Sequence, residues 1–163
     1  MSNEHVQESL FGEDGPPGAQ EGVIWGFADH RFLPNFHPSP IEFEGVVFPT
    51  VERAFQAAKT LVRSQRLAIA ALPTPGKAKR AGRKLDLRGD WEAVKVDCMR
   101  HLLRLKFRPA SALAAKLVAT HPARIFEANN WGDTFWGVDH RTGRGRNQLG
   151  ILLEEIRSEL MGS

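Results

Sequence analysis

The sequence predicts an α+β fold in which helices dominate and the β-sheet is small. Apolar residues recur at helical spacing through most of residues 51–160, whereas short strand-like runs occur only within residues 23–48 and near residue 125. The chain has 163 residues, of which 42% are hydrophobic and 25% are charged. These values are typical of one globular domain of ordinary composition.

The first 22 residues are expected to form a disordered acidic tail, and the folded domain is expected to span residues 23–163. The tail contains five acidic residues and no Lys or Arg, with Gly15-Pro16-Pro17-Gly18 near its middle. It has no periodic apolar residues that could pack into a core. Folding is therefore expected to begin near Val23.

Three strands are predicted near the start of this domain. Residues 23–27 form the first, and residues 41–43 and 46–48 alternate around Glu44-Gly45 as a hairpin. Residues 32–40 contain three prolines, which are incompatible with regular ladder pairing, so a loop is expected there. A further short strand is predicted at residues 124–128.

Six helices are predicted from capping and apolar spacing. The first begins after Thr50 and reaches about residue 62. Its expected buried face comprises Val51, Ala54, Phe55, Ala58, Leu61 and Val62. The next two are residues 65–72 and residues 75–84, the latter with Thr74 as N-cap and Pro75 as its first residue. Residues 91–107 follow the N-cap Asp90, and their expected buried face comprises Trp91, Val94, Cys98, Leu102 and Leu105. Residues 112–120 follow the N-cap Ser111, and the last helix follows the N-cap Asn147 with Leu149, Leu152, Leu153, Ile156 and Leu160 facing the core.

Several classes of protein are excluded or disfavoured by composition. A single cysteine, Cys98, rules out an internal disulfide framework and a zinc site with two thiolates, and it is expected to pack in the core. The six His residues fit neither a metal-ligand pattern nor a catalytic triad, so no metal and no cofactor are expected. No apolar run reaches the roughly 18 residues of a membrane span. A cytoplasmic protein without membrane contact is expected.

Positive charge is concentrated in residues 53–108, which carry 15 Lys or Arg residues against 4 Asp or Glu residues. Such a segment can attract phosphate groups on small or polymeric ligands. A solvated helical surface is the plainer interpretation. No zinc-finger spacing or aromatic RNA-binding motif accompanies the charge, so it does not by itself require a nucleic-acid reader.

Three segments are candidates for chemistry. Glu52, Gln56 and Lys59 share one helix face, where a carboxylate and an amine can reach a common ligand; a solvated polar face is the alternative. Residues 129–139 form a loop with two Trp and two Asp residues, suited to base stacking and proton transfer, unless the Trp rings fill the core. Residues 143–147 enter the last helix with two Arg residues, which is a weaker signal for an anion site.

Motifs in a fixed order resemble the NADAR/YbiA-like family over residues 23–161. They are Leu33-Pro34-Asn35-Phe36; Phe48 to Lys59; Ala78 to Arg83; Trp91 with Lys95 and Met99; Lys106-Phe107; Trp131 to Gly137; and Gly145 to Gly150. Two positions depart from the family pattern, which usually has Ser at Pro34 and His at Arg53. These departures remove a hydroxyl near the expected pocket and predict a difference in substrate or rate.

The resemblance implies an enzyme that hydrolyses the bond from ribose C1 to nitrogen. Its partner would be a phosphorylated ribose or ADP-ribose substrate. The family acts on phosphoribosylamino-pyrimidine intermediates of riboflavin synthesis, or removes ADP-ribose from guanine of DNA or RNA. A non-catalytic module that binds ADP-ribose or a nucleotide is the alternative, and a basic nucleic-acid-associated protein is a third.

The resemblance and the residues together nominate a site. Catalytic roles are expected for Glu52, Lys59, Asp133 and Trp136. Substrate-binding roles are expected for Asn35, Phe36, Arg53, Gln56, Arg83, Trp131, Asp139 and Asn147.

Two mechanisms fit these residues. A carboxylate can activate water while the C–N bond breaks through an oxocarbenium-like state. In the favoured route the ribosylamine opens and Lys59 attacks C1, giving a Schiff base that water hydrolyses, with Glu52 shuttling protons. A neutral lysine needs desolvation or a cationic neighbour, and direct pairing with Glu52 would oppose it.

Overall fold

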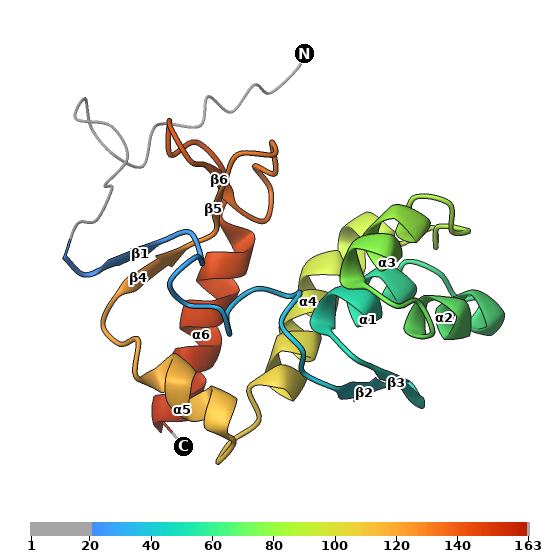
Figure 1. Cartoon of the computed structure of the whole chain (residues 1–163), viewed down its shortest axis with the longest axis horizontal. Coiled ribbons are helices and arrows are strands. Elements are labelled where there is room, and N and C mark those ends of the chain that lie inside the picture. Colours follow the sequence, from blue (N-terminus) through green and yellow to red (C-terminus); the bar gives the residue numbers. More distant parts are fainter. Residues whose placement is uncertain (1–20, 163) are drawn as a thin grey trace. The chain divides into compact units, whose positions relative to one another are not determined.

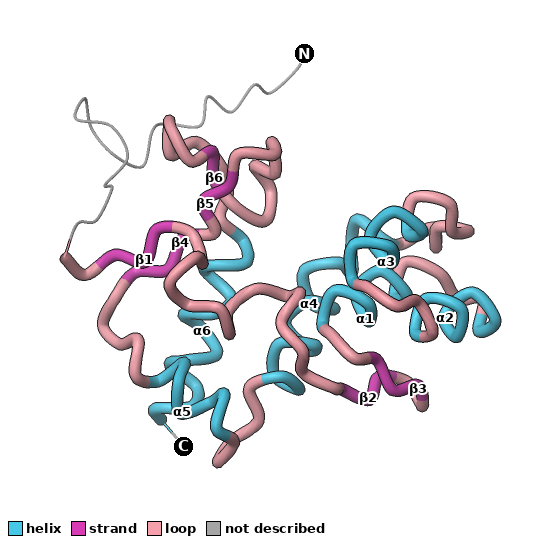
Figure 2. Tube along the Cα trace, viewed as in Figure 1, coloured by secondary structure: helices cyan, strands magenta, loops and turns pink. Residues whose placement is uncertain are grey.

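A computed structural model describes residues 21–162, so residues 1–20 of the expected acidic tail lie outside the described residues. Within that range the chain forms six helices and three two-stranded sheets, which confirms the predicted α+β class (Figures 1 and 2). The chain divides into two compact units. One is Arg31–Lys116, and the other joins the residues up to His30 with those from Leu117 onward.

The hairpin predicted in the unit Arg31–Lys116 is confirmed. Strands β2 (Ile41–Phe43) and β3 (Val46–Phe48) pair antiparallel, and in each strand the two outer apolar side chains are buried while the middle residue is exposed. The turn residues Glu44 and Gly45 both have positive φ, 47° and 77°, as the tight turn of a two-residue hairpin requires. Residues 31–40 contain no regular element, as the prolines predict.

Four helices follow in this unit: α1 (Val51–Ala58), α2 (Arg63–Ala70), α3 (Pro75–Gly82) and α4 (Trp91–Lys106). Helix α1 contacts α2, α3 and α4, and all eight of its residues are buried (Figure 1). Its N-cap is confirmed, since the Thr50 hydroxyl accepts a hydrogen bond of 3.2 Å from the Arg53 amide. The polar face of α1 is therefore inside the unit rather than in solvent.

Helix α1 ends earlier than predicted, and the expected burial of Leu61 and Val62 is wrong: they are 67% and 40% exposed. The carbonyls that another helical turn would use are bonded elsewhere. The Lys59 carbonyl accepts from the amide of Arg88 at 2.8 Å, and the Thr60 carbonyl accepts from the Arg66 guanidinium at 2.8 Å. These long-range partners stop the helix at Ala58.

The buried face of α4 also differs from the prediction. Val94, Cys98 and Leu105 are only partly buried. The fully buried residues are Trp91, Met99, Leu102, Leu103 and Lys106. Asp90 does not cap the helix with its side chain, because its carboxylate pairs with Arg88 at 2.6 Å instead. The core face is thus rotated from the one predicted, and it includes a lysine.

In the other unit, β1 (Val23–Trp25) pairs in parallel with β4 (Arg124–Phe126). The predicted strand 124–128 is interrupted at Glu127 and continues as β5 (Ala128–Asn129). Strand β5 pairs in parallel with β6 (Val138–Asp139), so the predicted loop 129–139 contains part of a short ladder. Helix α5 (Ala112–Val118) crosses the boundary along the chain between the two units, and the amide of Ala114 donates to the Ser111 hydroxyl at 3.1 Å.

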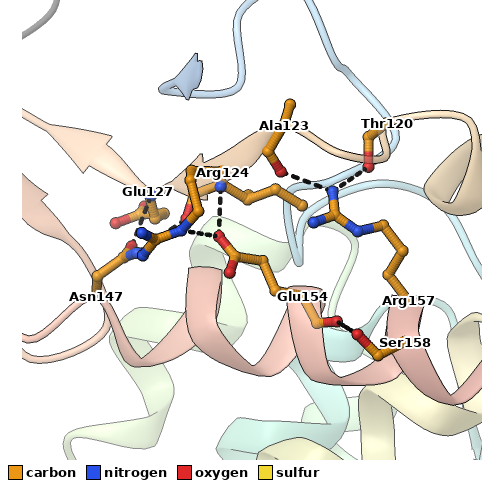
Figure 3. Close-up of polar contacts among 9 residues, drawn as sticks. Thr120, Ala123, Arg124, Glu127, Asn147, Glu154, Arg157 and Ser158 are labelled. Atoms are coloured by element: carbon orange, nitrogen blue, oxygen red, sulfur yellow. Dashed lines mark hydrogen bonds and ion pairs between the residues drawn. The ribbon is translucent and has the colours of Figure 1, made fainter. Parts of the chain in front are cut away.

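Helix α6 (Gln148–Gly162) packs against β4. Its predicted inward residues Leu149, Leu152, Leu153 and Ile156 are buried, whereas Leu160 is only partly so. Arg157 is buried too, and its guanidinium donates to Thr120 and to the carbonyl of Ala123 (Figure 3). Among residues 21–162, no helix is long and apolar enough to cross a membrane.

Candidate active site

The polar stripe of α1 centres on a buried carboxylate and amide. Glu52 and Gln56 are 7% and 4% exposed, and the Gln56 Nε2 donates to the Glu52 Oε1 at 2.9 Å. A carboxylate kept this far from water needs such donors, because burying an unpaired charge is costly. The arrangement excludes the solvated-face interpretation for these two residues. It fixes the orientation of a potential general acid or base.

Gly82, at the end of α3, makes room for this pair. A Cβ at position 82 would lie 1.9 Å from the Gln56 Oε1 and 2.9 Å from its Cδ. The same Oε1 is buried and has no hydrogen-bond partner among the described residues. The close approach of α3 to α1 thus requires glycine, and Gly82 belongs to the site although the sequence did not nominate it. Its motif, Ala78 to Arg83, was the available signal.

Replacing Gly82 with alanine should displace the Gln56 amide and misorient Glu52. We expect kcat to fall about 10- to 100-fold, as for a catalytic group misplaced by about 1 Å. Helix α3 should not be destabilised by the substitution itself, because alanine has a higher helix propensity than glycine. In a Gln56→Ala background the same Gly82→Ala change should have no further effect, because the clashing amide is gone. Additive losses in this double-mutant cycle would contradict the assigned role of Gly82.

Lys59 follows α1 as its C-cap residue and is half-buried. Its Nζ lies 5.9 Å from the centre of the Phe55 ring and has no hydrogen bond or ion pair to another residue in 21–162. Burial, the largest cause, lowers the pKa of Lys59 below its ordinary value, whereas the charge of Glu52 raises it. The two effects oppose each other as the sequence suggested, and burial is the larger.

Three further cations act on Lys59. The charges of Lys79 in α3, Arg83 after it and Lys95 in α4 each lower the pKa of Lys59. Lys95 also pairs with Glu92 at 2.5 Å. Arg83 was expected in the site, whereas Lys79 and Lys95 were not. The i,i+4 spacing of Lys79 and Arg83 was the signal for a shared helix face. Such a cluster can hold a phosphate.

The loop before β2 contributes Asn35. Its carbonyl accepts from the Glu52 amide at 3.1 Å, and its side-chain Nδ2 lies 3.5 Å from the Met99 sulfur. The Asn35 Oδ1 is buried and has no hydrogen-bond partner within residues 21–162. It is an acceptor that a ligand hydroxyl or amine could use. Phe36 beside it is 44% exposed and therefore open to stacking.

A buried lysine anchors this loop. The Lys106 Nζ donates to the carbonyls of Leu33 at 3.2 Å and Pro34 at 2.9 Å, and its side chain is almost wholly buried. Burial lowers the pKa of Lys106 to about 7. The lysine was not nominated by sequence, although its neighbours Leu102, Leu103 and Phe107 place it within an apolar stretch. It holds the segment that carries Asn35.

The pKa of Lys106 predicts how stability depends on pH. In the unfolded chain this lysine stays protonated up to its ordinary pKa of 10.5, whereas the folded chain releases the proton above about pH 7. The unfolded state therefore binds more protons between these values, and this group makes stability rise with pH by up to about 1.4 kcal/mol per unit. Below pH 7 the contribution is constant.

Urea unfolding of the wild type and Lys106→Met at pH 7 and pH 9 tests this dependence. The free energy of unfolding of the wild type should rise relative to that of the variant as pH increases. An exposed control, Lys84→Met, should follow the wild type at both pH values. A pH-independent difference between wild type and Lys106→Met would contradict the expected proton release.

Five other expected site residues belong to the unit that contains β4 and α6: Trp131, Asp133, Trp136, Asp139 and Asn147. Asp133 is held in a turn there. Its Oδ1 accepts from the amides of Phe135 at 3.2 Å and Trp136 at 2.9 Å. The Asn129 side chain stabilises this turn, because it makes two hydrogen bonds with the Asp133 backbone, at 2.8 and 3.1 Å. Trp136 packs edge-on against Phe135, whereas Trp131 is 63% exposed. Only Trp131 presents most of its surface to solvent.

Asp139 and Asn147 also have local partners. The Asp139 Oδ1 accepts from the amides of Arg141 and Thr142, and these hydrogen bonds lower its pKa. Asn147 does not cap α6 as predicted: its side chain bonds the Glu127 amide and the Ile125 carbonyl, at 3.0 and 2.8 Å (Figure 3). Both residues therefore shape the loop. The Arg side chains of the weaker anion-site candidate, residues 143–147, are exposed.

The family model described as the NADAR domain matches residues 16–161. The chain belongs to the NADAR domain family. N-glycosidase YbiA of Escherichia coli (strain K12) is 41% identical over 134 residues, 81% of this chain and 82% of that protein. An NMR structure of E. coli YbiA aligns with a TM-score of 0.73 at 36% identity, covering 87% of each chain. A riboflavin biosynthesis protein of Vibrio vulnificus is 37% identical over 81% of this chain but only 36% of its own length.

In this NADAR domain, Arg53 has a structural partner. Its Nε and Nη2 donate to the carbonyl of Leu72 at 3.1 and 3.0 Å, and its side chain is buried. This fork ties α1 to the segment between α2 and α3. The Arg53 nitrogens that could bind a substrate therefore already donate to a carbonyl of the protein. Position 53, where this chain departs from the family pattern, is occupied by a side chain that packs inside the unit.

The candidate site described above has the groups for acid–base and amine chemistry. Glu52 offers a carboxylate, Lys59 an amine of lowered pKa, and Asn35 and Gln56 acceptor oxygens. No cluster of three or more His, Cys, Asp or Glu residues that could hold a metal ion occurs within residues 21–162. Cys98 is partly buried, and burial raises the pKa of its thiol to about 11, which leaves it a poor nucleophile.

Proposed function

We propose that this chain is an N-glycosidase that hydrolyses the bond between ribose C1 and nitrogen in a phosphorylated ribose derivative. The family relationship supports the reaction class, since relatives of similar length are named N-glycosidase. The observation that carries the proposal is the desolvated amine of Lys59 on the same helix as the buried Glu52 carboxylate. Cations around Lys59 suit a substrate with phosphate groups.

In the proposed mechanism Lys59 acts as the nucleophile. The nitrogen lone pair of the ribosylamine expels the ring oxygen, which takes up a proton, and leaves an imine at C1. The neutral amine of Lys59 adds to C1, and both of its protons pass to the leaving nitrogen. That nitrogen departs as an amine, so that a neutral Schiff base joins C1 to Lys59. Water then hydrolyses the Schiff base, releasing the aldehyde form of the ribose and restoring the amine.

Glu52 is proposed to move protons in these steps. As a carboxylic acid it can protonate the departing nitrogen, and as a carboxylate it can activate the water that attacks the Schiff base. Gln56 holds the carboxylate by the 2.9 Å hydrogen bond to its Oε1. The charge of Glu52 raises the pKa of Lys59, so the lowering by burial and by three cations is what favours a reactive, neutral amine.

Two substrates fit this chemistry: ADP-ribose on guanine of nucleic acid, and a phosphoribosylamino-pyrimidine. The second is favoured by the riboflavin biosynthesis names of relatives in Vibrio vulnificus and Zea mays. The first is favoured by the excess of cations in residues 53–108, because a nucleic-acid substrate carries many more phosphates.

A paired turnover assay at one enzyme concentration tests the proposal. One sample contains DNA that is ADP-ribosylated on guanine and the other a phosphoribosylamino-pyrimidine, with products followed by mass spectrometry. Free ADP-ribose identifies the first substrate, and ribose phosphate with the free pyrimidine identifies the second. Tight binding without product from either would contradict the enzyme and favour a non-catalytic module that binds ADP-ribose or a nucleotide.

A further inference from the structure

Helix α3 carries two different basic faces. A helix advances about 100° per residue, so its buried side is the one marked by Ala78 and Gly82. Lys79 and Arg83 lie on one flank of that side, and their charges reach Lys59. Lys77 and Arg80 project from the opposite side of the helix, and Lys84 lies in the turn that follows it. All three side chains are exposed.

This outer stripe is not explained by the fold. None of the side chains of Lys77, Arg80 and Lys84 has a hydrogen bond or ion pair to any residue within 21–162. The first turn of α3 contains no acidic residue. Basic side chains that neutralise no carboxylate in their own protein repel each other and favour an external anion. The stripe is therefore a candidate surface for a polyanion.

The chemistry and dimensions of the stripe favour nucleic acid. It contains cations alone, without the apolar or aromatic residues that a helix lying on a membrane inserts. Lys77 and Arg80 are about one helical turn apart, and Lys84 follows in the turn after Gly82, so the stripe is on the order of 10 Å long. A nucleic-acid strand carries a negative charge on every nucleotide, so cations spread over about 10 Å can contact successive phosphates of one strand.

We propose that Lys77, Arg80 and Lys84 form a docking surface for the phosphodiester backbone of a nucleic-acid strand. The basic arc of α3 runs from Lys79 and Arg83, which act on Lys59, to this outer stripe. A strand docked there extends from the region in which the reacting ribose would bind. The proposed binding of nucleic acid depends only on these three side chains, whereas its link to turnover rests on the proposed function.

The test compares the full-length wild type with the triple variant Lys77→Gln/Arg80→Gln/Lys84→Gln. Binding of an unmodified, fluorescein-labelled single-stranded DNA is measured by anisotropy over a range of salt concentrations. The slope of log Kd against log salt should fall by about 2, since three phosphate contacts at about 0.7 each are lost. The matched control Arg31→Gln/Arg108→Gln/Lys116→Gln removes the same charge from exposed positions elsewhere in this unit.

Equal slopes for the wild type and the α3 variant, or equal losses in the α3 and control variants, would overturn the docking surface. Retained DNA binding together with lost binding to vesicles of anionic phospholipid would also overturn it, in favour of a membrane partner. Because this readout needs no turnover, failure of the proposed function leaves it intact.

Turnover provides the second readout. For ADP-ribosylated guanine within an oligonucleotide, the α3 variant should raise KM at least about 10-fold with kcat unchanged, as expected for loss of uniform binding. For the free ADP-ribosylated guanosine nucleotide, KM should stay the same, since no strand reaches the stripe. Equal KM changes for the two substrates would overturn the link between the stripe and the active site.

Discussion

Lys59→Ala is expected to abolish turnover, with kcat reduced by at least about 10³-fold, within the range known for loss of a nucleophile. The proposed Schiff base cannot form without the amine. Borohydride reduces a Schiff base to a stable secondary amine, so treatment during turnover should attach the ribose moiety of the substrate to wild-type protein only. Mass spectrometry of the intact chain and of the peptide containing Lys59 provides the measurement.

Lys59→Arg is the matched control. It keeps a positive charge near Glu52, but a guanidinium stays protonated and does not form the adduct. We expect it to bind substrate and to remain inactive and untrapped. Turnover that survives in Lys59→Ala would exclude the lysine route, and the carboxylate-activated water mechanism would then be the better account.

Glu52→Gln should lower kcat about 10²- to 10⁴-fold, the usual contribution of a positioned general acid or base. The new amide has nearly the same shape and can still accept the hydrogen bond from Gln56, so the fold should be preserved. Removing the carboxylate also removes the charge that raises the pKa of Lys59. The pKa of Lys59 should therefore fall further in this variant.

The pH dependence separates these two effects. If neutral Lys59 is required, the rate of adduct trapping rises with pH through the pKa of Lys59, and in Glu52→Gln this rise should move to lower pH. Gln56→Ala, which leaves the Glu52 charge in place, should not move it in that direction. An unshifted trapping profile in Glu52→Gln would contradict the electrostatic coupling between Glu52 and Lys59.

Local signals predicted much of the fold. The hairpin came from alternation around Glu44-Gly45, and the starts of α1 and α3 came from Thr50 and the Thr74-Pro75 pair. Capping and turn formation depend on residues close in sequence, so they can be inferred without knowing the rest of the chain. The grouping of Glu52, Gln56 and Lys59 followed from helical spacing for the same reason.

Expectations were wrong or incomplete where contacts between residues distant in sequence decide the structure. Helix α1 stops at Ala58 because Arg66 and the amide of Arg88 bond the next carbonyls. Asn147 bonds the segment after β4 instead of capping α6. These partners lie more than five residues away in sequence, in some cases more than twenty. The sequence pattern alone does not indicate which carbonyl or amide such a distant residue will bond.

The sequence by itself determined the α+β class, the family motifs and the helix face that carries Glu52 and Lys59. Only the tertiary structure decided that this face is buried, that Gly82 makes room for Gln56, and that Lys79 and Lys95 join Arg83 around Lys59. The physical reason is desolvation. The pKa of Lys59 falls because packing removes water and brings cations together, and packing is a property of the folded unit rather than of any one segment.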